Sequence, residues 1–129
     1  MARILIVDDY PGVLGMLQIM LTAAGHEVLM ADNGLLGLQL AERSHPELML
    51  IEIEMPVYDG VALCGDLKRN PELAPIPVLL MTGRLCLKEF HRGRGAGAFA
   101  IIPKPLSRQA LLTEITRAMA SRLVAGLRA

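Results

Sequence analysis

Short apolar runs alternate along the chain with stretches in which apolar residues recur at helical spacing. The first run, Ile-Leu-Ile-Val at positions 4–7, ends abruptly at Asp8 and Asp9. A β-branched and apolar run of this length is typical of a strand that is buried on both faces. Pro11 then stands where the first turn of a helix accepts proline, and leucines follow at helical spacing up to Gly25. The first 25 residues therefore predict one strand and one helix.

The same pattern repeats four more times. Further strands are expected at 28–30, 48–51, 78–81 and 98–102, and further helices at 33–44, 61–69, 86–92 and from position 107 nearly to the end. Strict alternation predicts an α/β fold, a single doubly wound five-stranded parallel sheet with five helices in the flavodoxin-like arrangement. We expect one domain over residues 1–129, with no output domain.

Composition narrows the classes of function. Hydrophobic residues make up 53% of the chain, but no unbroken apolar run reaches the ~18 residues of a membrane span. Thirteen basic and thirteen acidic side chains give a formal charge of zero, so the chain lacks the positive charge excess that favours nucleic acid or anionic lipid. A cytoplasmic location without direct binding to nucleic acid or membrane is expected.

Five polar side chains stand at or just after the predicted strand ends: Asp8, Asp9, Glu52, Thr82 and Lys104. In a doubly wound sheet the functional crevice lies beyond the carboxyl ends of the strands, so these side chains are expected to lie together. Carboxylate oxygens suit Mg²⁺, which also bridges to phosphate. The alternative for the acidic pair is a solvated turn that favours the start of the next helix through the helix dipole.

Four segments carry a family resemblance through their order and spacing. They are Ile-Leu-Ile-Val-Asp-Asp-Tyr, Pro-Glu-Leu-Met-Leu-Ile-Glu-Ile-Glu-Met-Pro-Val-Tyr-Asp-Gly, Ile-Pro-Val-Leu-Leu-Met-Thr-Gly and Ile-Pro-Lys-Pro-Leu. With these segments the chain resembles, over essentially its whole length, the receiver domain of response regulators, of the chemotaxis-regulator type. The resemblance implies a stand-alone signalling domain of a two-component system or phosphorelay, and not an enzyme.

The resemblance also implies roles for the residues at the strand ends. It places a weak magnesium site at Asp8 and Asp9, with residue 52 as the third ligand. It implies that the Thr82 hydroxyl bonds a phosphoryl oxygen and that Lys104 pairs with the acceptor carboxylate and later with the phosphoryl charge. Pro105 is similar to the cis-proline of the family.

The acceptor position is where the chain departs from the family. Glu52 stands where receivers carry the aspartate that accepts the phosphoryl group. The extra methylene extends the carboxylate by ~1.5 Å, and a misplacement of ~1 Å can cost about a hundredfold in rate. We expect a domain that is not phosphorylated at this position. We also hypothesise that Glu52 approaches Thr82 and Lys104 and partly imitates the phosphorylated state.

A second departure concerns the switch residue on the fifth strand. The aromatic that receivers rotate inward lies three residues before the lysine, and this position is Ile101. Phe99 is two residues earlier and is predicted to share the strand face with Ile101, although a buried core phenylalanine is the favoured interpretation. Asp59 belongs to a turn, is expected to point to solvent and does not replace the acceptor.

Partners follow from the resemblance. A sensor histidine kinase or a downstream effector protein is expected, and a homodimer through the fourth helix, fifth strand and last helix is the other interpretation. Leu35, Leu38 and Leu127 are candidates for exposed apolar contacts.

Two alternative functions stay open. One is an active receiver whose aspartate was changed to Glu52 as a phosphomimic. The other is a small flavodoxin-like enzyme that binds a cofactor, which is disfavoured because Asp8 and Asp9 would repel a phosphate.

Overall fold

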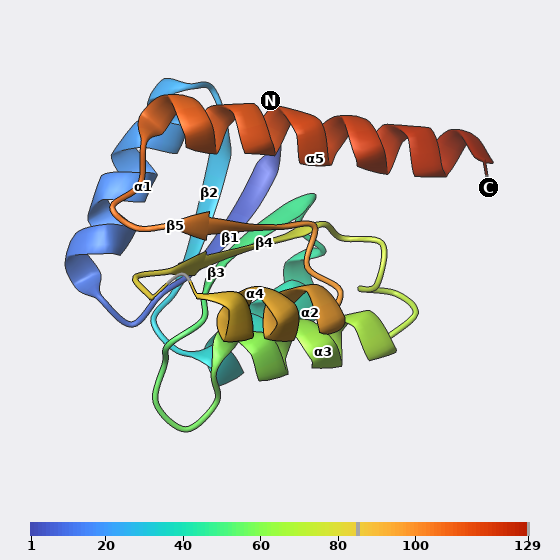
Figure 1. The fold of residues 1–129 in the computed structure, drawn as a ribbon. Helices are drawn as coiled ribbons and strands as arrows, with labels where there is room; N and C mark the ends of the chain where they lie inside the picture. Colours follow the sequence, from blue (N-terminus) through green and yellow to red (C-terminus); the bar gives the residue numbers. More distant parts are fainter. Residues whose placement is uncertain (85, 129) are drawn as a thin grey trace.

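Five strands and five helices alternate along the chain in the computed structural model, which describes residues 1–84 and 86–128, the side chains of 127 and 128 excepted (Figure 1). The strict βα alternation predicted from the sequence is confirmed. The helix expected at 86–92 runs to Gly95, and the fifth strand, expected from position 98, begins at Ala100. The elements are β1 (Arg3–Val7), α1 (Pro11–Ala23), β2 (Glu27–Ala31), α2 (Gly34–Ser44), β3 (Leu48–Glu52), α3 (Gly60–Arg69), β4 (Val78–Thr82), α4 (Leu87–Gly95), β5 (Ala100–Pro103) and α5 (Arg108–Arg128).

The strands form one parallel sheet in the order β2-β1-β3-β4-β5. Every residue of β3 and β4 is buried, which explains why these strands read as continuous apolar runs. Across the sheet, Val7 pairs with Ile51, and Ile51 pairs with Leu80. This register brings the ends of β1, β3 and β4 level at one edge, where the polar side chains begin.

The helices cover the sheet in two layers (Figure 1). Helices α1 and α5 bury Leu17, Leu21, Leu111 and Ile115 against one face. Helices α2 and α3 bury Ala41, Leu63 and Leu67 against the other face, and α4 lies on that side as well. The sheet is thus covered on both faces, as its apolar strands require. Among the described helices, none combines the length and the apolar character needed to cross a membrane.

The C-terminal half of α5 continues past the sheet (Figure 1). Up to residue 126, Ala118 is the last completely buried residue of α5, whereas the side chains of Leu123 and Val124 are 69% and 46% exposed. Of the apolar surface candidates, Leu35 is 58% exposed, but Leu38 packs against the core. The side chain of Leu127 lies outside the described residues.

Val57, in the loop between β3 and α3, has an unfavourable backbone conformation. Its φ is 70°, a left-handed value that β-branched residues rarely adopt, and its side chain is fully exposed. We expect Val57→Gly to raise the free energy of unfolding by about 0.5–1 kcal/mol, because glycine removes the Cβ clash at the cost of some chain entropy. Urea denaturation measures the change. Val57→Ala keeps the Cβ and should change stability little, so equal gains in both variants would contradict this explanation.

Candidate functional site

Asp8 follows β1 directly and is completely buried at the edge of the sheet. Its backbone N–H donates to the carbonyl oxygen of Ala31 at 3.1 Å, which ties the residue to the neighbouring strand. Its Oδ1 accepts a hydrogen bond from the N–H of Tyr10 at 2.9 Å, and its Oδ2 accepts one from Nζ of Lys104 at 2.8 Å. Both carboxylate oxygens of Asp8 therefore have a donor within the chain.

Glu52 is the last residue of β3 and is only 7% exposed. Its Oε1 accepts a hydrogen bond from Nζ of Lys104 at 2.5 Å, and its Oε2 accepts one from the N–H of Glu54 at 3.3 Å. Burial raises the pKa of Glu52, and the hydrogen bond and charge of Lys104 offset part of that rise. The predicted contact between Glu52 and Lys104 is thus present in the structure.

Lys104 joins the two buried carboxylates. Its backbone N–H donates to the carbonyl oxygen of Thr82 at 2.8 Å, and its peptide bond to Pro105 is cis, as predicted. Burial alone would lower the pKa of Lys104, but the hydrogen bonds to Asp8 and Glu52 outweigh burial and raise it. The ammonium group is therefore the positive centre of the site.

Thr82 has partners that differ from the prediction. Its hydroxyl oxygen accepts a hydrogen bond from the N–H of Arg84 at 2.9 Å and donates a long one to Oε1 of Glu54 at 3.5 Å. Within the described residues, Thr82 makes no hydrogen bond with Glu52. The hypothesised approach of Glu52 to Thr82 is thus not made as a hydrogen bond in the described residues. The longer side chain turns toward the ammonium, where the electrostatic attraction is greatest, and leaves Thr82 to Glu54.

The expected magnesium ligands are not gathered around one point. Asp9 is exposed at the start of the β1–α1 loop, while Asp8 and Glu52 both point to Lys104. Within residues 1–84 and 86–128, no group of three acidic, histidine or cysteine side chains is arranged to hold a metal ion. Carboxylate oxygens are suitable ligands for a hard cation such as Mg²⁺, but those of Asp8 and Glu52 are arranged around the Lys104 ammonium.

Two residues at this edge escaped the sequence analysis. Glu54 contacts both Glu52 and Thr82, and its Oε2 lies 3.5 Å from Nε of Arg84. The available signal was its spacing, because residues two apart in an extended segment point to the same side. Nothing in the sequence places Arg84 beside Glu54, since that contact joins two separate loops.

Asp59 is held away from the site. Its Oδ1 accepts a hydrogen bond from the N–H of Ala62 at 2.8 Å and thereby caps α3. Its Oδ2 pairs with Arg92 at 3.1 Å. Asp59 is the N-cap of α3 and Gly60 is its first residue, so the expected Asp-Gly turn before the helix is not formed, and the Asp59 carboxylate is paired where solvent exposure was expected.

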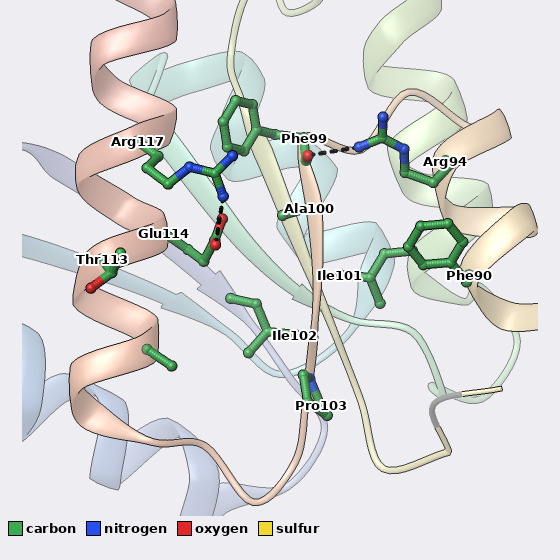
Figure 2. Close-up of a pocket in the computed structure, with 11 residues that line it drawn as sticks. Phe90, Arg94, Phe99, Ala100, Ile101, Ile102, Pro103, Thr113, Glu114 and Arg117 are labelled. Carbon is green, nitrogen blue, oxygen red and sulfur yellow. Dashed lines mark hydrogen bonds and ion pairs between the residues drawn. The ribbon is translucent and has the colours of Figure 1, made fainter. Parts of the chain in front are cut away.

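A shallow groove of about 470 Å³ lies between α4, β5 and α5 (Figure 2). Ile101 points toward Phe90 of α4, whereas the ring of Phe99 lies on the α5 side, with the Arg117 guanidinium 5.8 Å from its centroid. The predicted shared strand face of Phe99 and Ile101 is therefore wrong. Phe99 precedes β5 and packs with the α1 and α5 cluster, while Ile101 packs with the opposite one.

The arrangement of the site agrees with a family assignment made from the whole sequence. The family model described as "Response regulator receiver domain" matches residues 4–116. The chain belongs to this family. Receiver domains are signalling domains of two-component systems and not enzymes, which agrees with the expectation from the sequence.

Individual relatives support the assignment of this receiver domain. Protein PilH of Pseudomonas aeruginosa is 37% identical over 93% of this chain and 99% of its own length. A putative response regulator from Chloroflexus aurantiacus superposes with a TM-score of 0.89 at 30% identity, covering 92% of this chain and 98% of its own. The chain spans about half of the length of several other curated relatives, 48% or 49%, and 27% of the response regulator PleD of Caulobacter vibrioides.

Magnesium occurs in the active-site cleft of one solved receiver. This is the receiver domain of the sensor histidine kinase PA1611 from Pseudomonas aeruginosa, which was solved with a magnesium ion coordinated there. It superposes on this receiver domain with a TM-score of 0.86, covering 92% of this chain and 98% of its own at 23% identity. At that level of identity the likeness concerns the fold.

Proposed function

We propose that this receiver domain signals without a phosphoryl group on residue 52 and acts through protein–protein interaction. The observation that carries the proposal is the 2.5 Å hydrogen bond from Lys104 to Glu52 at the acceptor position. An acceptor carboxylate must reach a phosphorus atom in line with the leaving group. The Glu52 oxygens bind the ammonium and a backbone N–H from a side chain that is one methylene longer than an aspartate, so they are displaced from the place of an aspartate's oxygens and in-line attack is disfavoured.

The same contacts support a partial imitation of the phosphorylated state. Glu52 supplies a negative charge to Lys104, as a phosphoryl group on a shorter side chain would. It brings one charge and two oxygens where a phosphoryl group brings nearly two charges and three oxygens. Its oxygens have no hydrogen bond with Thr82 in the described residues. Glu52 therefore imitates the contact of a phosphoryl group with Lys104 but not its contact with Thr82.

Magnesium binding by Asp8, Asp9 and Glu52 stays a prediction, and we expect it to be weak. An entering ion would have to draw both buried carboxylates away from the Lys104 ammonium, which lies 2.8 Å and 2.5 Å from their oxygens. A cytoplasmic location likewise stays a prediction.

The groove between α4, β5 and α5 is the surface that we propose for a partner. It combines the exposed ring of Phe90, the side chain of Ile101, and the guanidinium groups of Arg94 and Arg117 on opposite sides (Figure 2). Such a groove suits an apolar anchor flanked by acidic groups. A sensor histidine kinase or a downstream effector is the proposed partner, and a homodimer through the same face is the second candidate.

Glu52→Asp tests the proposal, with the natural chain in parallel. Both proteins are treated with acetyl phosphate and Mg²⁺, and the intact mass is followed. We expect a phosphoryl mass gain for Glu52→Asp and none for the natural chain, because aspartate restores the shorter side chain beside the Lys104 ammonium. Lys104→Ala in the Glu52→Asp background is the control and should abolish the gain. Labelling of the natural chain on Glu52 would refute the proposal.

The contacts of the Lys104 ammonium with Asp8 and Glu52 also favour the phosphomimic alternative, in which Glu52 stands in place of a working aspartate. Partner binding separates the two functions. If Glu52→Asp must be phosphorylated to bind the partner of the natural chain, Glu52 acts as a phosphomimic. If unphosphorylated Glu52→Asp binds equally well, residue 52 plays no part in partner recognition.

A further inference from the structure

Strand β2 is the last strand on its side of the sheet, so one of its edges is free (Figure 1). The N–H of Glu27 donates to the carbonyl oxygen of Ala2 at 2.9 Å, and Glu27 therefore faces β1. Because successive residues of a strand turn their backbone groups to opposite sides, the N–H and C=O groups of Val28 and Met30 point away from β1. In the described part of the chain, no other segment pairs with this edge.

The free edge of β2 lacks the features that usually prevent strand pairing. Proteins protect such edges with proline, lysine or a β-bulge. Strand β2 contains neither proline nor lysine, and Glu27 is its only charged residue. All five of its residues pair with β1 in unbroken register, so no bulge bends the strand away. The edge can therefore accept a further strand.

The surface around this edge carries almost no charge. Helices α1 and α2 both contact β2, and α1 has no charged residue. Between positions 10 and 41 only Glu27 and Asp32 are charged, although the chain has thirteen acidic and thirteen basic side chains. Burial does not explain this depletion, because Ile19 of α1 and Leu35 of α2 are 74% and 58% exposed. An exposed apolar surface without charges is typical of the centre of a protein interface.

We propose that the chain forms a homodimer in which β2 pairs antiparallel with β2 of a second copy. A two-fold axis at Leu29 places Val28 opposite Met30 of the partner subunit, and the converse pair follows by symmetry. Each pair exchanges two backbone hydrogen bonds, so all outward groups of the two residues are used. The same axis brings α1 next to α1 and α2 next to α2. This interface is separate from the groove between α4, β5 and α5 and does not depend on residue 52.

The residues just beyond the ends of β2 are complementary in the same register. The register places His26 opposite Asp32 of the partner subunit. Nδ1 of His26 accepts a hydrogen bond from the N–H of Ala2 at 3.1 Å, so a neutral ring has its proton on Nε2 and donates from there. The exposed Asp32 carboxylate is an acceptor, with Oδ1 bonded to Nδ2 of Asn33 at 2.8 Å and Oδ2 left for the imidazole.

A second copy fits this surface better than a membrane or an unrelated protein. Helices that lie on a membrane carry basic residues on their polar face, and α1 has none. An unrelated partner would have to supply an open strand edge of its own, whereas a second copy presents one by symmetry. A highly charged partner would meet no opposite charges on α1.

Sedimentation velocity of the full chain between about 1 and about 100 μM tests the inference. We expect a dimer that dissociates on dilution. Leu35→Lys should weaken dimerisation by at least about tenfold, because each copy would bring a charge into an uncharged interface. Phe90→Lys adds the same charge to the groove beside α4 and should leave the dissociation constant within about twofold. A monomer at every concentration, or equal weakening by both variants, would overturn the inference.

Met30→Pro tests the backbone hydrogen bonds themselves. Proline removes the outward N–H of residue 30 and leaves the hydrogen bonds between β2 and β1 in place, since proline is accepted where an edge N–H faces solvent. This variant should be monomeric, with a folded chain confirmed by circular dichroism. A folded variant that still dimerises would contradict strand pairing. Leu35→Lys, on the surface of α2, decides the question if proline unfolds the chain.

The antiparallel register is tested by cross-linking in a Cys86→Ser background, which removes the exposed native thiol. Leu29→Cys places two thiols on the two-fold axis, where opposite Cα atoms lie about 4.5 Å apart and a disulfide can form. Met30→Cys is the matched control, because its thiols are not opposite each other. With oxidised glutathione, we expect a disulfide-linked dimer of Leu29→Cys to form at least about tenfold faster. Cross-linking of Met30→Cys at an equal or higher rate would overturn the proposed pairing.

Discussion

Replacing Lys104 with methionine should lower the free energy of unfolding by about 3 kcal/mol. Methionine keeps much of the side-chain length but removes the ammonium that pairs with Asp8 at 2.8 Å and with Glu52 at 2.5 Å. Both carboxylates are buried, so each would be left as a charge without a partner. The loss is expected to be large because an unpaired buried charge keeps its desolvation cost after its attraction is gone.

Urea denaturation at neutral pH measures this loss, with Glu52→Gln added to Lys104→Met as the control. The double variant leaves one buried charge unpaired in place of two, so it should recover a substantial part of the stability. Equal destabilisation in the single and double variants would show that lost packing, and not charge, is the cause. A loss below about 1 kcal/mol for Lys104→Met would place the pair among weak surface ion pairs.

Gly60→Ala should have an effect of similar size, for a steric reason. A Cβ at position 60 would lie 2.1 Å from the carbonyl oxygen of Glu52 and 2.9 Å from Cα of Ile53. The N–H of Gly60 also donates to the carbonyl oxygen of Ile53 at 2.8 Å, which holds the two segments together. We expect a loss of about 3 kcal/mol, because backbone atoms cannot move away as a flexible side chain can.

Gly65→Ala is the matched control, because it lies on the same helix α3. A Cβ at position 65 would meet only the guanidinium of Arg69, at an ordinary 3.6 Å. Alanine there should raise stability by about 0.5–1 kcal/mol, since glycine is a poor helix former. Thermal or urea denaturation compares both variants with the natural chain. A stability gain from Gly60→Ala would contradict the close approach of α3 to β3.

The fold could be predicted almost completely from the sequence, because hydrophobic periodicity reports directly on which residues are buried. Runs such as 48–51 and 78–81 are buried throughout, and the alternation with helical stretches leaves a parallel sheet as the simplest arrangement. The bounds of α4 were less certain, because its arginines and glycines give no clear apolar stripe. Gly93 within it packs against Ile101, a contact that the sequence does not show.

Four members of the site could be predicted from the sequence, but Glu54, Arg84 and the side-chain pairings could not. Asp8, Glu52, Thr82 and Lys104 meet at one edge because each ends or follows a strand. Which donor each carboxylate binds depends on the length of its side chain and on the conformation of the loops that follow β3 and β4. Glu52 bends to Lys104, and Thr82 is left to Glu54. Spacing along a strand does not encode such choices.

The far end of α5 acts geometrically as a lever arm. The match to the family model ends at residue 116, and Ala118 is the last completely buried residue up to position 126, yet the helix continues to Arg128. At ~1.5 Å per residue, the ten residues beyond Ala118 extend roughly 15 Å along the helix axis. If this ~15 Å segment of α5 tilted by about 10°, its C-terminal tip would move by about 2.5 Å. A small rearrangement at β5 would therefore become a larger displacement at a surface far from Glu52.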